Sequence, residues 1–153
     1  MNAKLVIPGV CLAGAAVLVI DGMKKSEAHV AYLNEVEKLN RTPLTNHGQR
    51  DEITANMAKI REAIDPQQTK LCLDEQKLAS KAKTLEEKII HYRRALEIDP
   101  DNENVIETLA DQLLALGEKD EARLLYKKIA DNSKIAVKVS IAKGMMRLID
   151  QKK

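Results

Sequence analysis

The stretch "ALEIDPDNENVIETLA", residues 95–110, contains the end of one predicted helix and the start of the next. Pro100 cannot continue the first helix, because proline has no amide hydrogen and its ring clashes with the preceding turn. Asp101 or Asn102 can cap the second helix by accepting a hydrogen bond from one of its first free amides. The stretch therefore predicts a tight reversal between two antiparallel helices.

The composition favours helices over the rest of the chain as well. The 153 residues include no Phe, no Trp and only three Tyr, so a core must be built from Leu, Ile, Val, Ala and Met. Such side chains suit thin helical layers, and an all-β sandwich is disfavoured. The net charge of +2 provides no broad basic field for nucleic-acid phosphates. Cys72 is predicted to be a small buried apolar residue.

An apolar run near the amino terminus predicts membrane targeting. Residues 5–20 carry no charge and lie between Lys4 and Asp21. The length of this run lies between that of a usual signal-peptide core, about 7–15 residues, and the roughly 20 residues that span a bilayer. Cleavage after "AGA" at residues 13–15 would leave an apolar new terminus, so we favour a retained signal-anchor or transmembrane helix over residues 1–22.

Small and charged residues in and around this run bear on the packing and the orientation of the anchor. Gly9 and Ala13 have the spacing by which small residues let two membrane helices approach, although the same spacing also occurs in helices that only face lipid. Lys24 and Lys25 after the run compete with Lys4 before it in setting the orientation. A short tail with one lysine is also typical of an export signal, so we lean towards an exported, periplasmic location of the remainder.

Beyond the anchor, helical spacing and turn residues predict a series of short helices. Residues 23–66 are expected to form a divergent helical hairpin, with its first helix over about 24–40. Asp65 and Pro66 provide a cap and a first-turn residue for the next helix. Thr84 and Glu87 have the capping-box spacing. Gly117, which lacks a Cβ atom, can end a helix in the left-handed conformation, so that the next helix begins near Lys119.

Residues 67–153 contain a weak internal repeat. A shift of 34 residues superimposes Tyr92 on Tyr126 and Glu87 on Glu121, and a helical hairpin of about this length is the unit of tetratricopeptide repeats. Residues 103–136 resemble that family at seven apolar, small or aromatic positions: Ile106, Leu109, Ala110, Leu113, Gly117, Ala122 and Tyr126. Residues 69–102 match less well. The resemblance implies an all-α, tetratricopeptide-like superhelix of about seven helices, preceded by the transmembrane helix.

The resemblance also implies a binding groove, because the first helix of each repeat lines the concave face in that family. The corresponding positions here are Lys70, Leu73, Lys77, Asn104, Glu107 and Asp111. Glu107 and Asp111 replace residues by which some members clamp a peptide carboxylate, so a chaperone-tail receptor is disfavoured. Two alternatives remain: a mixed-charge peptide groove, or simple surface pairing of Lys70 and Lys77 with Glu107 and Asp111.

The last predicted helix, residues 134–150, has more apolar surface than a helix packed on one side requires. Its second apolar side consists of Val137, Ile141, Met145 and Leu148. We expect this side to dock a partner subunit or a second copy, or to be buried by the chain's own helices.

The sequence contains no recognisable catalytic, cofactor or metal motif. His29, His47 and His91 lie in separate segments without metal-ligand spacing, and there is no glycine-rich phosphate loop. We therefore expect a non-catalytic, membrane-anchored adaptor without cofactors, acting as an assembly factor or accessory subunit of a larger membrane complex. The alternative is an exported, soluble peptide carrier or chaperone released by signal cleavage.

Overall fold

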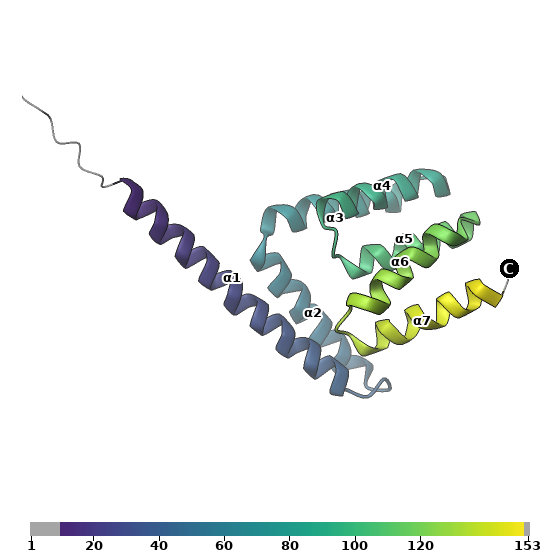
Figure 1. The fold of residues 1–153 in the computed structure, drawn as a ribbon, viewed down its shortest axis with the longest axis horizontal. Helices are drawn as coiled ribbons and strands as arrows, with labels where there is room; N and C mark the ends of the chain where they lie inside the picture. The colour runs from purple at the N-terminus through teal and green to yellow at the C-terminus, as the bar shows by residue number, and fades with distance from the viewer. Residues whose placement is uncertain (1–9, 152–153) are drawn as a thin grey trace, which may run out of the picture.

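The computed structural model describes residues 10–151, which form seven helices and no strand (Figure 1). The all-α prediction is therefore confirmed. The helices are α1 (Val10–Arg41), α2 (His47–Ile64), α3 (Pro66–Lys81), α4 (Leu85–Ile98), α5 (Glu103–Leu116), α6 (Lys119–Asn132) and α7 (Ala136–Gln151).

The predicted helix ends are formed by the expected side chains. Asp65 accepts a hydrogen bond from the Gln68 amide at 3.0 Å, and Thr84 and Glu87 make the reciprocal capping box of α4. Gly117 ends α5 with a φ of 94°, in the left-handed region that favours glycine. At the reversal after α4, Asn102 and not Asp101 is the N-cap residue of α5. These local signals fixed the helix boundaries correctly.

The first helix differs from the prediction. α1 runs without a break through the expected boundary at residue 22, because the segment contains no proline and its charged residues are compatible with a helix. No helix among residues 10–151 is long and apolar enough to cross a membrane, so the described residues do not support the predicted transmembrane helix. Gly9 and the rest of residues 1–9 lie outside the described residues, while Ala13 lies in the first turn of α1.

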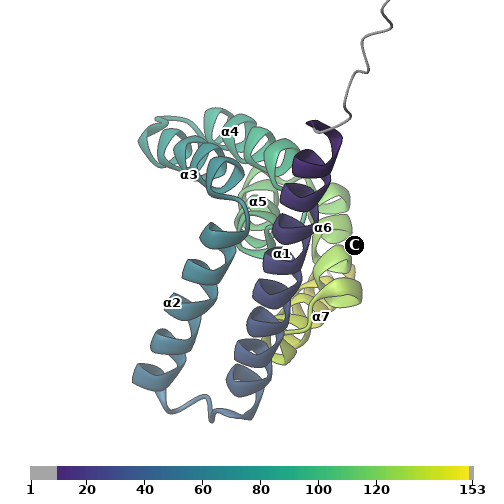
Figure 2. The same ribbon diagram turned by 90° about the vertical axis from the view of Figure 1, so that its left-hand side faces the viewer.

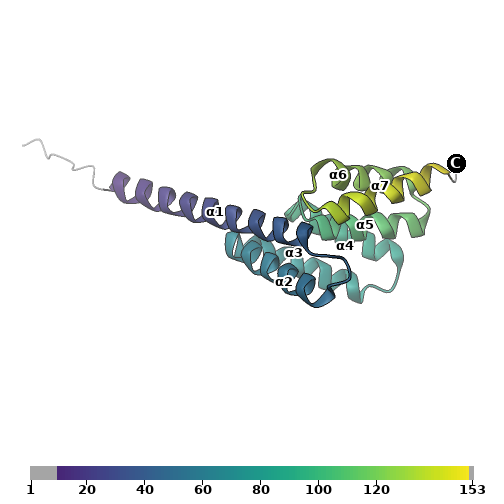
Figure 3. The same ribbon diagram turned by 90° about the horizontal axis from the view of Figure 1, so that it is seen from below.

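Helices α3 to α7 pack in order of sequence, each against the next (Figures 1 and 3). Small residues allow this close packing: Ala95, Ala110 and Ala122 are fully buried between larger apolar neighbours. The largest buried side chain is Tyr126, which joins a cluster with Ile106 and with Ala142 of α7. The core of this stack is therefore continuous from α3 to α7.

Helices α1 and α2 form a separate hairpin that makes little contact with α3 (Figure 2). Val36, Met57 and Ile135 belong to one buried cluster, so this hairpin packs against the start of α7. The Asn40 amide side chain donates to the Lys134 carbonyl and accepts from the Ala136 amide, both at 2.8 Å. The amino-terminal hairpin is thus attached to the far end of the stack. The amino-terminal part of α1 extends beyond the other helices (Figure 3).

Candidate functional site

Side chains of α3, α5 and α7 share one face of the stack, as the predicted groove requires. Leu73 of α3, Asn104 of α5 and Lys138 of α7 line a hollow of about 290 Å³. Met57 and Ala58 of α2 also line this hollow, so the amino-terminal hairpin borders this face. The structure therefore brings together two predicted groove residues, Leu73 and Asn104.

Lys138 is the central charge of this face. Its Nζ atom donates to Asn104 Oδ1 at 2.6 Å and lies 3.6 Å from Glu107 Oε2 and 3.7 Å from Glu103 Oε2. These contacts tie α7 to α5 across the groove. Lys138 was not predicted as a groove residue, although it stands 34 residues after Asn104. Extending the repeat period by one more unit would have found it.

The expected surface pairs between α3 and α5 are not formed, and this alternative is wrong. Lys77 pairs instead with Asp74 of its own helix, with 3.1 Å between Nζ and Oδ1. Glu107 is engaged by Lys138 of α7. Lys70 is exposed and makes no ion pair within residues 10–151. The carboxylates of α5 therefore face α6 and α7 and not the lysines of α3.

Asp111 accepts a hydrogen bond from the Tyr126 hydroxyl of α6. Tyr126 is only 1% exposed. Burial, followed by this hydrogen bond to Asp111, raises the pKa of the Tyr126 hydroxyl well above its ordinary value of 10.0. The predicted groove residue Asp111 thus orients the core side chain of Tyr126 and does not line the hollow.

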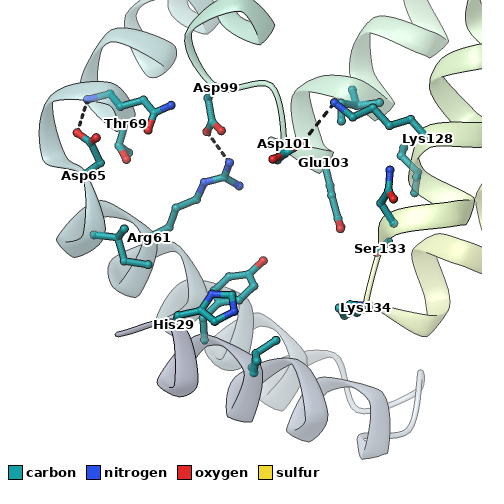
Figure 4. Close-up of a pocket in the computed structure, with 17 residues that line it drawn as sticks. His29, Arg61, Asp65, Thr69, Asp99, Asp101, Glu103, Lys128, Ser133 and Lys134 are labelled. Carbon is teal, nitrogen blue, oxygen red and sulfur yellow. Dashed lines mark hydrogen bonds and ion pairs between the residues drawn. The ribbon is translucent and has the colours of Figure 1, made fainter. Parts of the chain in front are cut away.

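A second hollow, of about 820 Å³, lies between the amino-terminal hairpin and the α4–α5 and α6–α7 connections (Figure 4). Its best-buried charge is Asp99, which is 8% exposed. Asp99 accepts from the Arg61 guanidinium at 2.5 Å and from the Asn102 amide side chain at 3.1 Å. Lys128 lies 3.4 Å from Asp101 on the other side (Figure 4). These two ion pairs, Arg61–Asp99 and Lys128–Asp101, join neighbouring elements across the hollow, which suits a structural joint better than a ligand site.

Sequence reasoning missed the contact between Arg61 and Asp99, because the two residues are far apart in the chain. Tyr32 of α1 lines the same hollow. Burial, and to a smaller extent the nearby Glu103 carboxylate, raise the pKa of the Tyr32 hydroxyl above its ordinary value. Because Asp99 binds Arg61, the Asp99–Pro100 turn attaches α2 to the stack as well as ending α4.

The four predicted docking residues of α7 divide into two pairs. Val137 packs against the cluster of α1 and α2, and Met145 packs against the cluster that includes Ile106. Ile141 and Leu148 remain 46% and 52% exposed. The chain's own helices therefore cover half of this apolar side and leave the other half free.

The reactive side chains His91 and Cys72 contact neighbouring polar residues. His91 Nδ1 lies 2.8 Å from Glu75 Oε2 between α4 and α3. Cys72 is buried, and burial raises the pKa of its thiol, which disfavours the nucleophilic thiolate. Among the described residues, no group of three or more His, Cys, Asp or Glu side chains is placed to hold a metal ion.

Comparisons of the chain with protein-family models, with curated proteins and with solved structures found no match.

Proposed function

We propose that this chain is a non-catalytic, tetratricopeptide-like scaffold that binds another protein through the face formed by α3, α5 and α7. The observation that carries the proposal is the hollow that Leu73, Asn104 and Lys138 line together. Leu73 is a large apolar side chain left exposed at this place. An apolar contact beside a few convergent polar groups is typical of a protein-binding face.

The stacked hairpins support the tetratricopeptide-like assignment. Ala110 and Ala122 allow α5 and α6 to pack closely, and Tyr126 fills the space beside them. The fixed order of contacts from α3 to α7 is expected of an α-α superhelix. Such scaffolds act by providing contact area, which requires neither a cofactor nor a catalytic residue.

The proposed scaffold acts at a membrane, as an assembly factor or accessory subunit of a larger membrane complex. The support is the uncharged sequence of residues 5–20, which is typical of targeting or anchoring segments. Since α1 continues from Val10 to Arg41, such an anchor would be joined to the binding face without a flexible linker.

The test is site-specific crosslinking in the native cells, with a photoreactive residue replacing Leu73 on the groove. A matched control replaces Leu124 on α6, which is 64% exposed and lies outside the hollow. The proposal predicts one membrane protein crosslinked from position 73 and absent from position 124. Equal labelling from both positions would contradict a specific binding face.

The mass of the intact protein extracted from membranes tests the anchor separately. Retention of the amino-terminal segment is expected. A mature chain that begins after residue 16 would instead favour the exported, soluble carrier. Either result leaves the crosslinking result at Leu73 interpretable.

A further inference from the structure

α7 buries only one of its sides against the stack. Ala142 and Ile149 are buried in the cluster with α5 and α6. The opposite side is centred on Gly144, whose neighbours on the helix surface are the residues three and four positions away. These neighbours are Ser140, Ile141, Arg147 and Leu148. Among the described residues, α1 and α2 cover this side at Val137, whereas Ile141 and Leu148 farther along it remain exposed.

Glycine at position 144 is not explained by packing within the chain. A glycine in the middle of a helix lowers helix stability relative to alanine. A Cβ atom added to Gly144 would meet no atom within 4 Å, so no neighbouring helix requires its absence. The glycine leaves the helix backbone accessible at this point, so that the backbone of an external element can approach it closely.

The side chains around Gly144 indicate what that element would be. Ile141 and Leu148 form an exposed apolar edge on one side of it. Lys143 and Arg147 are exposed on the other side, and neither makes an ion pair within residues 10–151. The one carboxylate of α7, Asp150, is engaged by Arg123 at 2.9 Å. The free side of α7 is therefore apolar along one edge and positively charged along the other.

We propose that this side of α7 docks an amphipathic helix of a partner protein, which crosses at Gly144. The partner helix has apolar residues spaced three and four positions apart, which contact Ile141 and Leu148, and carboxylates along the edge that faces Lys143 and Arg147. A second copy of α7 is disfavoured as the occupant, because it would bring the same unpaired cations together. This inference rests on the proposed scaffold function and names the partner of its carboxyl-terminal surface.

The test measures binding of a synthetic amphipathic helix to the full chain by fluorescence anisotropy. The probe is a peptide of about 20 residues with leucines at helical spacing and glutamates flanking them. The control peptide has the same leucines with lysines in place of the glutamates. We expect the acidic peptide to bind about tenfold more tightly at low salt, and the difference to shrink as salt screens the charges.

Variants of α7 connect this binding to the proposed site. Gly144→Gln is expected to weaken binding of the acidic peptide about tenfold while thermal stability is unchanged or higher, because glutamine favours helix more than glycine. The matched control Leu124→Glu changes an exposed leucine of α6 and is expected to leave binding unchanged. Normal binding by Gly144→Gln, equal affinity for both peptides, or no affinity for the acidic peptide would overturn the inference.

Two further outcomes separate this inference from the scaffold proposal. Self-association in sedimentation experiments that is abolished by Ile141→Glu would make a second copy the occupant and overturn the inference. Specific crosslinks from position 73, together with no binding of the acidic peptide, would also overturn it but leave the scaffold function standing. Loss of both the crosslinks and the peptide binding would contradict both proposals.

Discussion

Replacing Asn40 by alanine should loosen the α1–α2 hairpin from the stack without unfolding α3 to α6. The Asn40 side chain makes two hydrogen bonds that connect α1 to Lys134 and Ala136. The other described attachments are the Arg61–Asp99 ion pair and the apolar cluster around Ile135. The hairpin makes little contact with α3, so local opening does not require the stack to melt.

The expected size of the effect follows from the two hydrogen bonds. Each contributes about 0.5–1.5 kcal/mol, and because Asn40 is exposed, water partly replaces the lost partners. We therefore expect the opening free energy of the hairpin to fall by about 1–2 kcal/mol, which is an increase of about 5- to 30-fold in the open population.

Amide hydrogen exchange measures this directly, because α2 should exchange faster by the same factor while α5 does not change. The control is Asn34→Ala on the same helix, since Asn34 is exposed and the replacement changes helix propensity in the same way. Equal exchange of α2 in the two variants, or equally increased exchange in α5, would refute the reasoning.

Three further predictions concern stability. Gly144→Ala should raise the free energy of unfolding by about 0.5–1 kcal/mol in chemical denaturation, since the new Cβ atom meets no neighbour. Asp99→Ala should lower it by about 1–2 kcal/mol by leaving Arg61 unpaired, whereas Asp101→Ala, at a side chain that is 92% exposed, should change it by less than about 0.5 kcal/mol. The pKa of the Tyr126 hydroxyl is raised in the folded state, so its contribution to the free energy of unfolding is complete below pH about 10 and is lost as the pH rises further. The Tyr126→Phe variant should therefore lose less stability than the unchanged protein between about pH 10 and 12 in chemical denaturation.

Local chemistry made the helices predictable from the sequence. The capping box at Thr84, the left-handed Gly117 and the Asp65 cap each depend on residues within one helical turn, which a sequence displays directly. The choice between Asp101 and Asn102 was left open, because both side chains can cap and the register of α5 decides between them.

From the sequence, the candidate site could be predicted only for residues that lie within the recognised repeats. Leu73 and Asn104 were found because the resemblance to tetratricopeptide repeats assigns both residues to groove-lining positions, one on α3 and one on α5. The pairing of Arg61 with Asp99 depends on the angle between α2 and α3, and no local sequence pattern specifies that angle. The coverage of Val137 by the amino-terminal hairpin depends on the same angle.

Because α1 is one continuous helix, a small tilt at one of its ends produces a large displacement at the other. Its 32 residues extend over about 48 Å at 1.5 Å per residue, and only the carboxyl-terminal part contributes to the described buried clusters. A tilt of about 10° at the amino-terminal end of a rigid helix of this length would displace the other end by roughly 8 Å. A contact that fixes the first turns of α1 would therefore set the position of the groove, and a partner that displaces the groove would in turn displace those first turns.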